Sequence, residues 1–438
     1  MFEKIFKLKE NGTDIKTEVL AGITTFMTMA YIICVQPVVL SKCGMDFGAV
    51  MTATCISSAI ATLLMGIMAN YPIALAPAMG HNFFFAFTVC LGMGIPWQTA
   101  LGAVFISGAL FIILSFVGIR EHIVDAVPQS LKSGIAVGIG FLIAFVGLQW
   151  SGIVTKDPAI MVKLGDLKSG PVMLSIFGVT VITTFMLLKI RGAILLGIVG
   201  TTLLGLHLKI LNFHGIAKIP PSIGPTFLQL DIVGAFNLGL LTVIFIFFFL
   251  DLFDTIGTLI GIAEEADLMK DGKLPRARQA LLSDAIGTVG GAILGTSTVT
   301  SYIESSSGVA EGGRTGLANV VTSSLFLIAL FFYPLIRTVG EGVTVNQSEL
   351  HPVVAPALIV VGSLLFKGIT KIKWGDVSES IPAFLTLVIM PLTFSITEGI
   401  SFGFISYSFL KCISGRHREA HWIVHVFAIL FVLRYIFL

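Results

Sequence analysis

The chain has 438 residues, of which 55% are hydrophobic and only 12% are charged, and its mean hydropathy is +0.96. A soluble domain carries about 25% charged residues, so this composition excludes an ordinary soluble protein and indicates a polytopic membrane protein. The formal net charge of +2 decides little, because in a membrane protein the placement of charge matters more than its sum. We therefore expect a lipid bilayer around the chain and no nucleic-acid partner.

The chain begins with a charged arm, residues 1–18, which lacks the apolar core of a cleavable signal peptide. Apolar runs of about 15–25 residues then follow one another, and together they predict about fourteen spans. The last apolar stretch, 421–438, contains Arg434 and is either a further span or an interfacial helix. In this layout most of the 27 Lys and Arg residues lie on the side of the N-terminus. This bias predicts a cell-membrane protein with a cytoplasmic N-terminus.

Two stretches interrupt the apolar pattern at matching places. One is the third span of the first half (72–91), and the other is the third span of the second half (297–313). Their Gly, Ser and Pro residues make poor lipid-facing helices, and irregular backbone survives at membrane depth only where protein or a water-filled cavity covers it. The expected fold is an all-α polytopic membrane protein of two inverted seven-segment repeats with broken helices in the third segment of each, as in secondary transporters.

The first broken stretch, Ala76 to Val89, reads APAMGHNFFFAFTV. An amide beside aromatic rings suits a flat heteroaromatic ligand, because rings stack on it and Asn82 offers both a donor and an acceptor. Asn82, Phe83 and Phe85 are therefore candidate binding residues. The alternative is that Asn82 only satisfies the broken backbone, and that His81 is a structural donor.

The eighth span carries two carboxylates, Asp251 and Asp254, three residues apart and so roughly on one helix face. Carboxylates are costly in an apolar span and are typically kept for a proton, a cation or a polar substrate. Because burial and mutual repulsion disfavour two charges, one of the two is expected to carry a proton. The alternative is that an Asp binds a helix end or a nearby hydroxyl. Asp284, in the ninth span, is interpreted as a structural residue near the interface.

The second broken stretch places Glu304 between Tyr302 and Ser305. Half-helix ends expose unpaired N–H and C=O groups, and a carboxylate beside them can read the donor and acceptor edge of a nucleobase. Farther along, Glu311 and Arg314 are interpreted as a local ion pair or helix cap.

Enzyme and metal signatures are missing from the sequence. It contains no HExxH, Walker A or GxSxG motif, and the Gly-rich stretch 287–295 lacks the Lys-Ser/Thr of a nucleotide loop. The five cysteines are scattered and form no CxxC or Cys/His cluster. We therefore expect no enzymatic activity, no cofactor, no metal site and no disulfide framework.

Four stretches together resemble the adenine/guanine/hypoxanthine (AzgA-type) permeases of the xanthine/uracil permease superfamily. They are APAMGHNFFFAFTV, FFFLDLFDTIGTLIG, GTSTVTSYIESSSGVAEGGRTGL and PAFLTLVIMPLTFSITEGISFGF, and the resemblance covers nearly the whole chain from AGITTFMTMAYI onward. It implies import of purine nucleobases by proton symport, often by a homodimer. It also implies a core domain from 19–118 and 237–336, and a gate domain from 131–211 and 352–412.

Carried over by position, the resemblance implies that Asn82, Asp254 and Glu304 contact the purine or its coupled proton. The chain departs from the family at GHNFFFAF, where the pattern more often reads GLNAFFAF, so His81 and Phe83 bear on which purine is taken. The predicted substrate-binding residues are Asn82, Phe83, Phe85, Asp254, Tyr302, Glu304 and Ser305, and the predicted proton-coupling residues are Asp254, Asp251 and Glu304.

The leading hypothesis is a proton–purine symporter. An anion or other small-solute transporter is the first alternative, because the positive ends of two half-helices suit an anion; Asp254 and Glu304 argue against it by repulsion. An intramembrane enzyme would need a nucleophile or metal set that the sequence does not show. A purine sensor without transport would be expected to carry a signalling domain, and none is appended.

Overall fold

A computed structural model describes residues 2–117, 127–236, 238–266, 268–269, 274–345 and 348–437. Within these ranges seven helices are long and apolar enough to cross a membrane, and four further apolar helices are shorter. The remaining expected spans fall on elements that are shorter or more polar. The seven long helices are Ile15–Ser41, Phe47–Ala69, Trp97–Ser115, Gln129–Trp150, Gly170–Leu187, Leu240–Ala263 and Gly316–Gly340.

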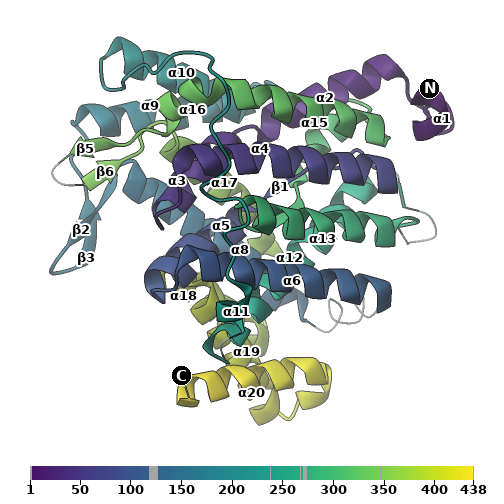
Figure 1. The fold of residues 1–438 in the computed structure, drawn as a ribbon. Helices are drawn as coiled ribbons and strands as arrows, with labels where there is room; N and C mark the ends of the chain where they lie inside the picture. The colour runs from purple at the N-terminus through teal and green to yellow at the C-terminus, as the bar shows by residue number, and fades with distance from the viewer. Residues whose placement is uncertain are drawn as a thin grey trace.

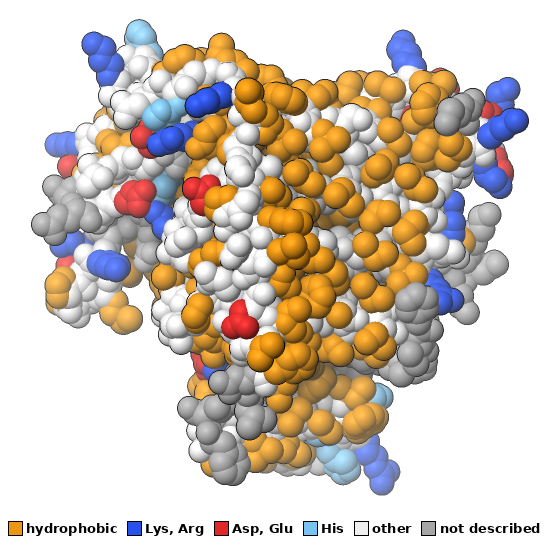
Figure 2. Space-filling view, in the orientation of Figure 1, with side chains coloured by type: hydrophobic (Ala, Val, Ile, Leu, Met, Phe, Trp, Pro, Cys, Tyr) orange, Lys and Arg blue, Asp and Glu red, His pale blue; other side chains and the backbone are white. Residues whose placement is uncertain are grey.

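The helices lie largely parallel to one another (Figure 1). The N-terminal arm lies at one end of these parallel helices, and two β-hairpins project at the other end. On the face shown in Figure 2, charged side chains gather mainly toward the two sides of the view, with a broad hydrophobic band between them. This distribution is that of a multi-pass membrane protein, whose apolar belt faces lipid.

The first half begins with helices that flank the first broken stretch. Its elements are α1 (Phe2–Phe6), α2 (Ile15–Met29), α3 (Ile32–Ser41), α4 (Phe47–Leu64), η1 (Met65–Ala69), β1 (Leu75–Pro77), α5 (Met79–Phe83), η2 (Phe84–Gly92), α6 (Trp97–Val117), α8 (Gln129–Trp150), β2 (Val154–Asp157), β3 (Met161–Leu164), α9 (Gly170–Leu187), α10 (Ala193–His207) and α11 (Ile232–Ala235). The β2–β3 hairpin is antiparallel. An irregular strap, residues 208–231, runs from α10 to α11 (Figure 1).

The second half contains the second broken stretch, also between long helices. Its elements are α12 (Leu238–Glu265), α13 (Ala277–Leu294), β4 (Val299–Ser301), η3 (Ile303–Ser305), α14 (Ser306–Ala310), α15 (Gly316–Ala329), η4 (Leu330–Phe332), α16 (Tyr333–Gly340), β5 (Val343–Val345), β6 (Ser348–Leu350), α17 (Ala355–Leu365), η5 (Phe366–Lys371), α18 (Val377–Thr393), α19 (Ile396–Ile413), η6 (His417–Glu419) and α20 (Trp422–Phe437).

The two broken stretches meet as a buried two-stranded antiparallel ladder. β1 pairs with β4, with Ala76 opposite Thr300 at the centre, and all six strand residues are buried. Matching hydrogen bonds flank the ladder, since the Ala78 N–H donates to the Thr298 carbonyl and the Tyr302 N–H donates to the Ala74 carbonyl, both at 2.9 Å. The two breaks are thus related locally by a two-fold arrangement, and each supplies the backbone partners that the other has lost.

Each break is therefore a short strand followed by a helix. Sequence reasoning predicted an interruption at both places but not that the two would pair as strands. Pro77 holds the preceding residue extended, and the β-branched Val299 and Thr300 favour a strand. These local preferences agree with the observed geometry, but the pairing itself joins residues more than two hundred positions apart.

A buried carboxylate fixes the start of α15. Glu18 of α2 is fully buried, and its Oε1 accepts hydrogen bonds from the N–H groups of Arg314 (2.8 Å) and Thr315 (3.1 Å). Its Oε2 accepts from the N–H of Ala318 at 3.1 Å. Glu18 thereby satisfies the otherwise unpaired N–H groups of the helix start, where negative charge is also favoured by the helix dipole.

The interpretation of Glu311 and Arg314 as a local ion pair is wrong. Glu311 Oε1 instead lies 2.6 Å from Nε of Arg191, in the turn between α9 and α10. The Arg314 guanidinium donates to the carbonyls of Val309 (2.8 Å) and Gly313 (2.7 Å), so its role as a cap is confirmed. The two charges therefore serve different contacts, and the ion pair ties α14 to the α9–α10 turn.

We expect Glu18→Ala to destabilise the protein by about 2–3 kcal/mol, because it leaves three backbone N–H groups buried without an acceptor. Glu18→Gln, which keeps one acceptor oxygen, should lose less. Thermal unfolding of the purified protein in detergent measures both. Glu10→Ala is the control, because Glu10 is exposed and pairs with Lys7 on the surface. Equal melting temperatures for Glu18→Ala and Glu10→Ala would contradict this account.

Candidate functional site

Two carboxylates of the second half of the chain, one beside the second broken stretch and one within it, lie near each other. Asp254 projects from α12 and Glu304 from η3, and their charges are close enough to interact. Asp254 is exposed to solvent and Glu304 is partly exposed. These two candidates, both predicted from sequence, are therefore brought together in the structure.

The face of α12 that carries Asp254 is uncovered. Gly257 and Gly261 follow at spacings of three and seven residues, which places them on this same face. A Cβ built on either glycine would meet no atom within 4 Å. No described atom therefore packs against the α12 surface at Gly257 and Gly261, on the face that carries the exposed Asp254.

Tyr31 completes the carboxylate site, and sequence reasoning missed it. Tyr31 lies between α2 and α3, is buried, and donates from its hydroxyl to Glu304 Oε1 at 2.7 Å. The Thr28 hydroxyl lies 3.3 Å from the Glu304 carbonyl. The available signal was a phenol inside the first predicted span, but nothing in the sequence said which carboxylate it would meet.

Tyr302 and Ser305 hold the backbone of the other broken stretch. The Tyr302 hydroxyl donates to the Pro77 carbonyl at 2.5 Å, and the Ser305 hydroxyl accepts from the Ala74 N–H at 3.0 Å. Both side chains are buried. In this state both polar groups are engaged in joining the two breaks, next to Glu304.

Asn82 lies in a separate polar network inside the protein. Its side-chain oxygen accepts a hydrogen bond from the Ser297 hydroxyl. Gln36 of α3 donates to Ser297 at 3.1 Å and to Thr296 at 2.8 Å. Asn82 is fully buried, and its side-chain nitrogen has no hydrogen-bond partner among the described residues. This network of side chains links α5 to α3 and to the segment just before β4, and the contact of Asn82 with a ligand stays a prediction.

The aromatic residues beside Asn82 pack in the interior. Phe83 stacks on Phe87 with ring centroids 5.5 Å apart, and Phe85 lies against Phe247 of α12 at 6.4 Å. Both Phe83 and Phe85 are fully buried. His81 is also buried, and neither of its ring nitrogens has a hydrogen-bond partner in the described ranges. The structure thus shows no exposed ring at these positions, and their contact with a ligand stays a prediction.

Asp251 and Asp284 lie deeper than Asp254. Asp251 is fully buried, with the Thr288 hydroxyl 3.4 Å from its Oδ2, so it does not share the open surface at Asp254. Asp284 accepts from the Ser301 N–H (3.0 Å) and from the Thr255 hydroxyl (2.9 Å). Asp284 is therefore structural, as interpreted, but the expected place near the interface is wrong, because it binds the buried strand β4.

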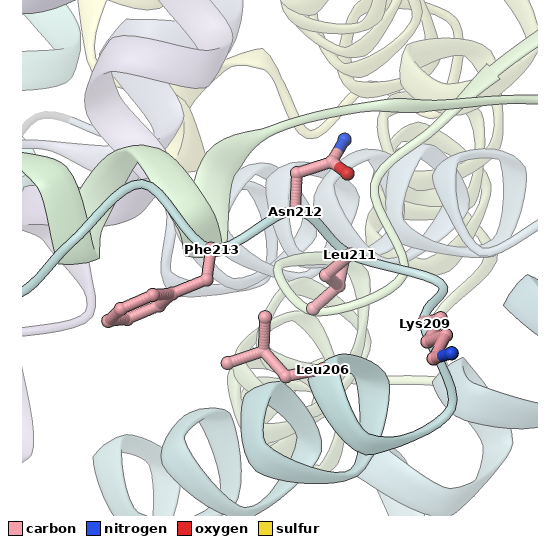
Figure 3. A pocket seen from close by; sticks show the side chains of 5 residues that line it. All are labelled: Leu206, Lys209, Leu211, Asn212 and Phe213. Carbon is pink, nitrogen blue, oxygen red and sulfur yellow. The ribbon is translucent and has the colours of Figure 1, made fainter.

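A large surface hollow lies apart from these residues. Its volume is about 610 Å³, and its lining contains none of the predicted site residues (Figure 3). The lining residues, at the end of α10 and the start of the strap, are Leu206, Lys209, Leu211, Asn212 and Phe213. Among the described residues no group of three or more His, Cys, Asp or Glu side chains is placed to hold a metal ion.

Comparison with known proteins identifies the class of transporter. A family model described as "Permease family" matches residues 16–402. The chain belongs to the nucleobase permease family. This permease is 54% identical to a putative permease of Methanocaldococcus jannaschii, over 100% of this chain and 98% of the relative. Membership confirms the expected resemblance and makes the protein a transporter and not an enzyme.

Two relatives carry more specific names. This permease is 45% identical to the adenine permease AdeP of Escherichia coli, over 100% of this chain and 96% of the relative. It is 46% identical to the guanine/hypoxanthine permease PbuG of Bacillus subtilis, over 99% of both chains. Among solved structures, the transmembrane domain of the cyanobacterial bicarbonate transporter BicA has a TM-score of 0.62 at 16% identity, covering 88% of this permease and 96% of that domain. The last likeness shows a shared membrane-transporter fold.

We expect Tyr31→Phe to raise the KM for the transported nucleobase by about tenfold, because a hydrogen bond to a charged group is lost at Glu304. Uptake of labelled base at several concentrations separates KM from the maximal rate. Tyr407→Phe is a matched control, since Tyr407 donates to Glu379 at 3.1 Å in a buried contact outside this site. An unchanged KM in Tyr31→Phe would show that Glu304 does not depend on this phenol.

Proposed function

We propose that this permease imports purine nucleobases by proton symport. The observation that carries the proposal is the pair Asp254 and Glu304, which lie together beside an open face of α12 at the junction of the two broken stretches. Relatives named for adenine and for guanine and hypoxanthine, at 44–46% identity over nearly the whole chain, support the purine. In this proposal the proton gradient drives transport, and no cofactor takes part.

The proposed topology has fourteen segments in two inverted repeats, with the N-terminus in the cytoplasm. The core domain comprises 19–118 and 237–336, and the gate domain comprises 131–211 and 352–412; residues 118, 237, 267 and 270–273 lie outside the described ranges. The local two-fold arrangement of β1 and β4 supports the inversion. A homodimer stays a prediction.

Within the C-terminal stretch 421–438, Trp422–Phe437 form the sixteen-residue helix α20. Such a helix is about 24 Å long, less than the roughly 30 Å of a hydrocarbon core. Phe427 of α20 packs on Phe404 of α19 (5.8 Å) and on Phe245 of α12 (4.7 Å). We therefore propose that α20 is an additional helix that packs against both proposed domains and is not a full fifteenth span.

In the proposed mechanism the two carboxylates share the work of coupling. Two nearby negative charges repel each other, so a proton taken by Asp254 lowers the cost of closing the site around a base. Asp251, buried one turn earlier on α12, assists Asp254 in holding this proton. Glu304, which accepts a hydrogen bond from Tyr31, accepts N–H groups of the base. Movement of the core domain against the gate domain then carries base and proton together to the cytoplasm.

The alternative is an anion or other small-solute transporter. The likeness to the bicarbonate transporter domain and the helix starts next to β1 and β4 favour it, because helix N-termini attract anions. The two carboxylates at the same place oppose it, since an anion would enter beside negative charge. Uptake of labelled purines against labelled bicarbonate in the same cells separates the two functions.

We expect Asp254→Asn to abolish concentrative uptake, with at least a tenfold loss of accumulated hypoxanthine, because the amide cannot carry the coupled proton. Uptake would be measured in cells lacking their own purine carriers, with and without a protonophore. Asp157→Asn, in the β2–β3 hairpin, is the control. Full protonophore-sensitive accumulation by Asp254→Asn would show that Asp254 does not carry the coupled proton. Uptake by the unmodified protein that is unchanged by the protonophore would contradict proton symport.

A further inference from the structure

We infer that Lys42 and Glu349 form a latch that closes the outer side of the transport path. The inference rests on the proposed function and its topology, and it adds the contact that must open before a base can enter from outside. In that topology α3, η2, α8 and α18 each end on the outer side. The β5–β6 hairpin, which carries Glu349, projects at the end of the molecule opposite the N-terminal arm (Figure 1).

The latch is an ion pair between two segments that are far apart in the chain. Lys42 follows α3, and its Nζ lies 2.6 Å from Oε2 of Glu349 on β6. The same ammonium lies over the ring of Trp150, 5.8 Å from the ring centroid. Trp150 is the last residue of α8. Lys42 therefore joins the proposed core domain both to the hairpin and to a helix of the proposed gate domain.

The residue that follows the β5–β6 hairpin attaches it to the gate domain. The His351 N–H donates to the Trp150 carbonyl at 2.9 Å, and the two side-chain rings pack with centroids 4.8 Å apart. His351 Nδ1 also lies 3.0 Å from the Gly340 carbonyl at the end of α16. The hairpin thus sits at the boundary of the two proposed domains, and the ion pair of Glu349 closes across that boundary.

An aromatic layer next to the latch joins the same domains. Phe87 of η2 has its ring centroid 6.4 Å from that of Trp150 and 6.4 Å from that of Phe394, in the turn between α18 and α19. The Thr88 hydroxyl donates to the Phe394 carbonyl at 3.0 Å. A core-domain element is therefore in contact with two gate-domain segments here, directly beside the ring that Lys42 covers.

This layer lies between the latch and the first broken stretch. Phe87 stacks on Phe83, whose neighbour in the chain is Asn82. A continuous series of contacts thus runs from Lys42 through Trp150 and Phe87 to Phe83. For a base to come in from outside, the core and gate domains have to separate along this series, as they do when one domain rocks against the other.

The cytoplasmic side of α12 is different. α12 runs from the outer to the cytoplasmic side in the proposed topology, so Gly257 and Gly261 lie toward the cytoplasm. A Cβ on either glycine would meet no atom within 4 Å, and Asp254 on the same face is exposed. In this proposal the structure is the inward-facing state, closed outside by the latch and the aromatic layer.

The strength of the ion pair suits a contact that opens in every transport cycle. The Lys42 side chain is 24% exposed and the Glu349 side chain is 53% exposed. Solvent-exposed ion pairs shift an equilibrium by only a few-fold, whereas breaking a buried pair costs much more. A latch of this kind biases the permease toward the inward-facing state without trapping it there.

Thiol labelling from outside tests the latch. Thr88→Cys places a thiol in the aromatic layer of the full-length protein, after Cys43→Ser and Cys90→Ser have removed the other thiols near it. A membrane-impermeant maleimide added to intact cells reaches this thiol when the outer side opens. Lys42→Glu sets two carboxylates against each other, so we expect labelling about fivefold faster. Lys42→Glu combined with Glu349→Lys restores an ion pair and should return labelling to near the original rate.

Lys163→Glu is the matched control in the same labelling experiment. Lys163 pairs with Asp157 at 3.0 Å, inside the β2–β3 hairpin and away from the domain boundary. Its labelling rate should stay unchanged. Equal rates in Lys42→Glu and Lys163→Glu would overturn the latch. A double charge reversal that labels as fast as Lys42→Glu alone would overturn it too, because the effect would then not come from the ion pair.

Uptake separates the latch from the proposed function. A weaker latch populates the outward-facing state more, so the KM for external hypoxanthine should fall by up to about fivefold in Lys42→Glu. A KM equal to that of the unmodified protein would overturn the place of the latch in the transport cycle and leave purine transport standing. Absence of purine uptake by the unmodified protein would instead overturn the proposed function, and the labelling experiment would still decide the latch.

Discussion

The antiparallel pairing of β1 with β4 is the constraint on which the rest of this structure depends. A helix that is interrupted inside a membrane leaves N–H and C=O groups without partners, and lipid offers none. Here the two interruptions satisfy each other, through three facing residue pairs and the flanking bonds of Ala78 and Tyr302. Because neither break is tolerable alone, the two halves of the chain must close on each other for either to be stable.

This pairing also determines where the carboxylates lie. Glu304 follows β4 by three residues and is held by Tyr31 at the break between α2 and α3. Asp284 binds the N–H of Ser301 and so attaches α13 to the same strand. The costly groups of the interior thus fall into two kinds. Glu18 and Asp284 accept hydrogen bonds from backbone N–H groups. Asp254 accepts no hydrogen bond from the described residues and is available to solvent or a ligand.

The comparisons separate what a fold decides from what its side chains decide. The bicarbonate transporter domain shares the architecture at 16% identity, while the nucleobase permeases share nearly half of their residues with this chain. A fold supplies the junction of two broken stretches, but the ligand is set by the groups that project into it. In the proposed function the two carboxylates accept N–H groups at this junction, which suits a nucleobase better than an anion.

The amino-acid sequence by itself determined the membrane class, the family and the places of both breaks. It also identified Asp254 and Glu304, because a carboxylate in an apolar span is costly enough to stand out without any structure. Only the tertiary structure decided how those groups are used. Tyr31 donates a hydrogen bond to Glu304, and Glu311 pairs with Arg191. Asp251 is buried beneath the exposed surface at Asp254, and Asn82 accepts a hydrogen bond from Ser297 in the interior. These outcomes depend on contacts between residues far apart in the chain, and local composition carries no record of which distant partner a side chain will meet.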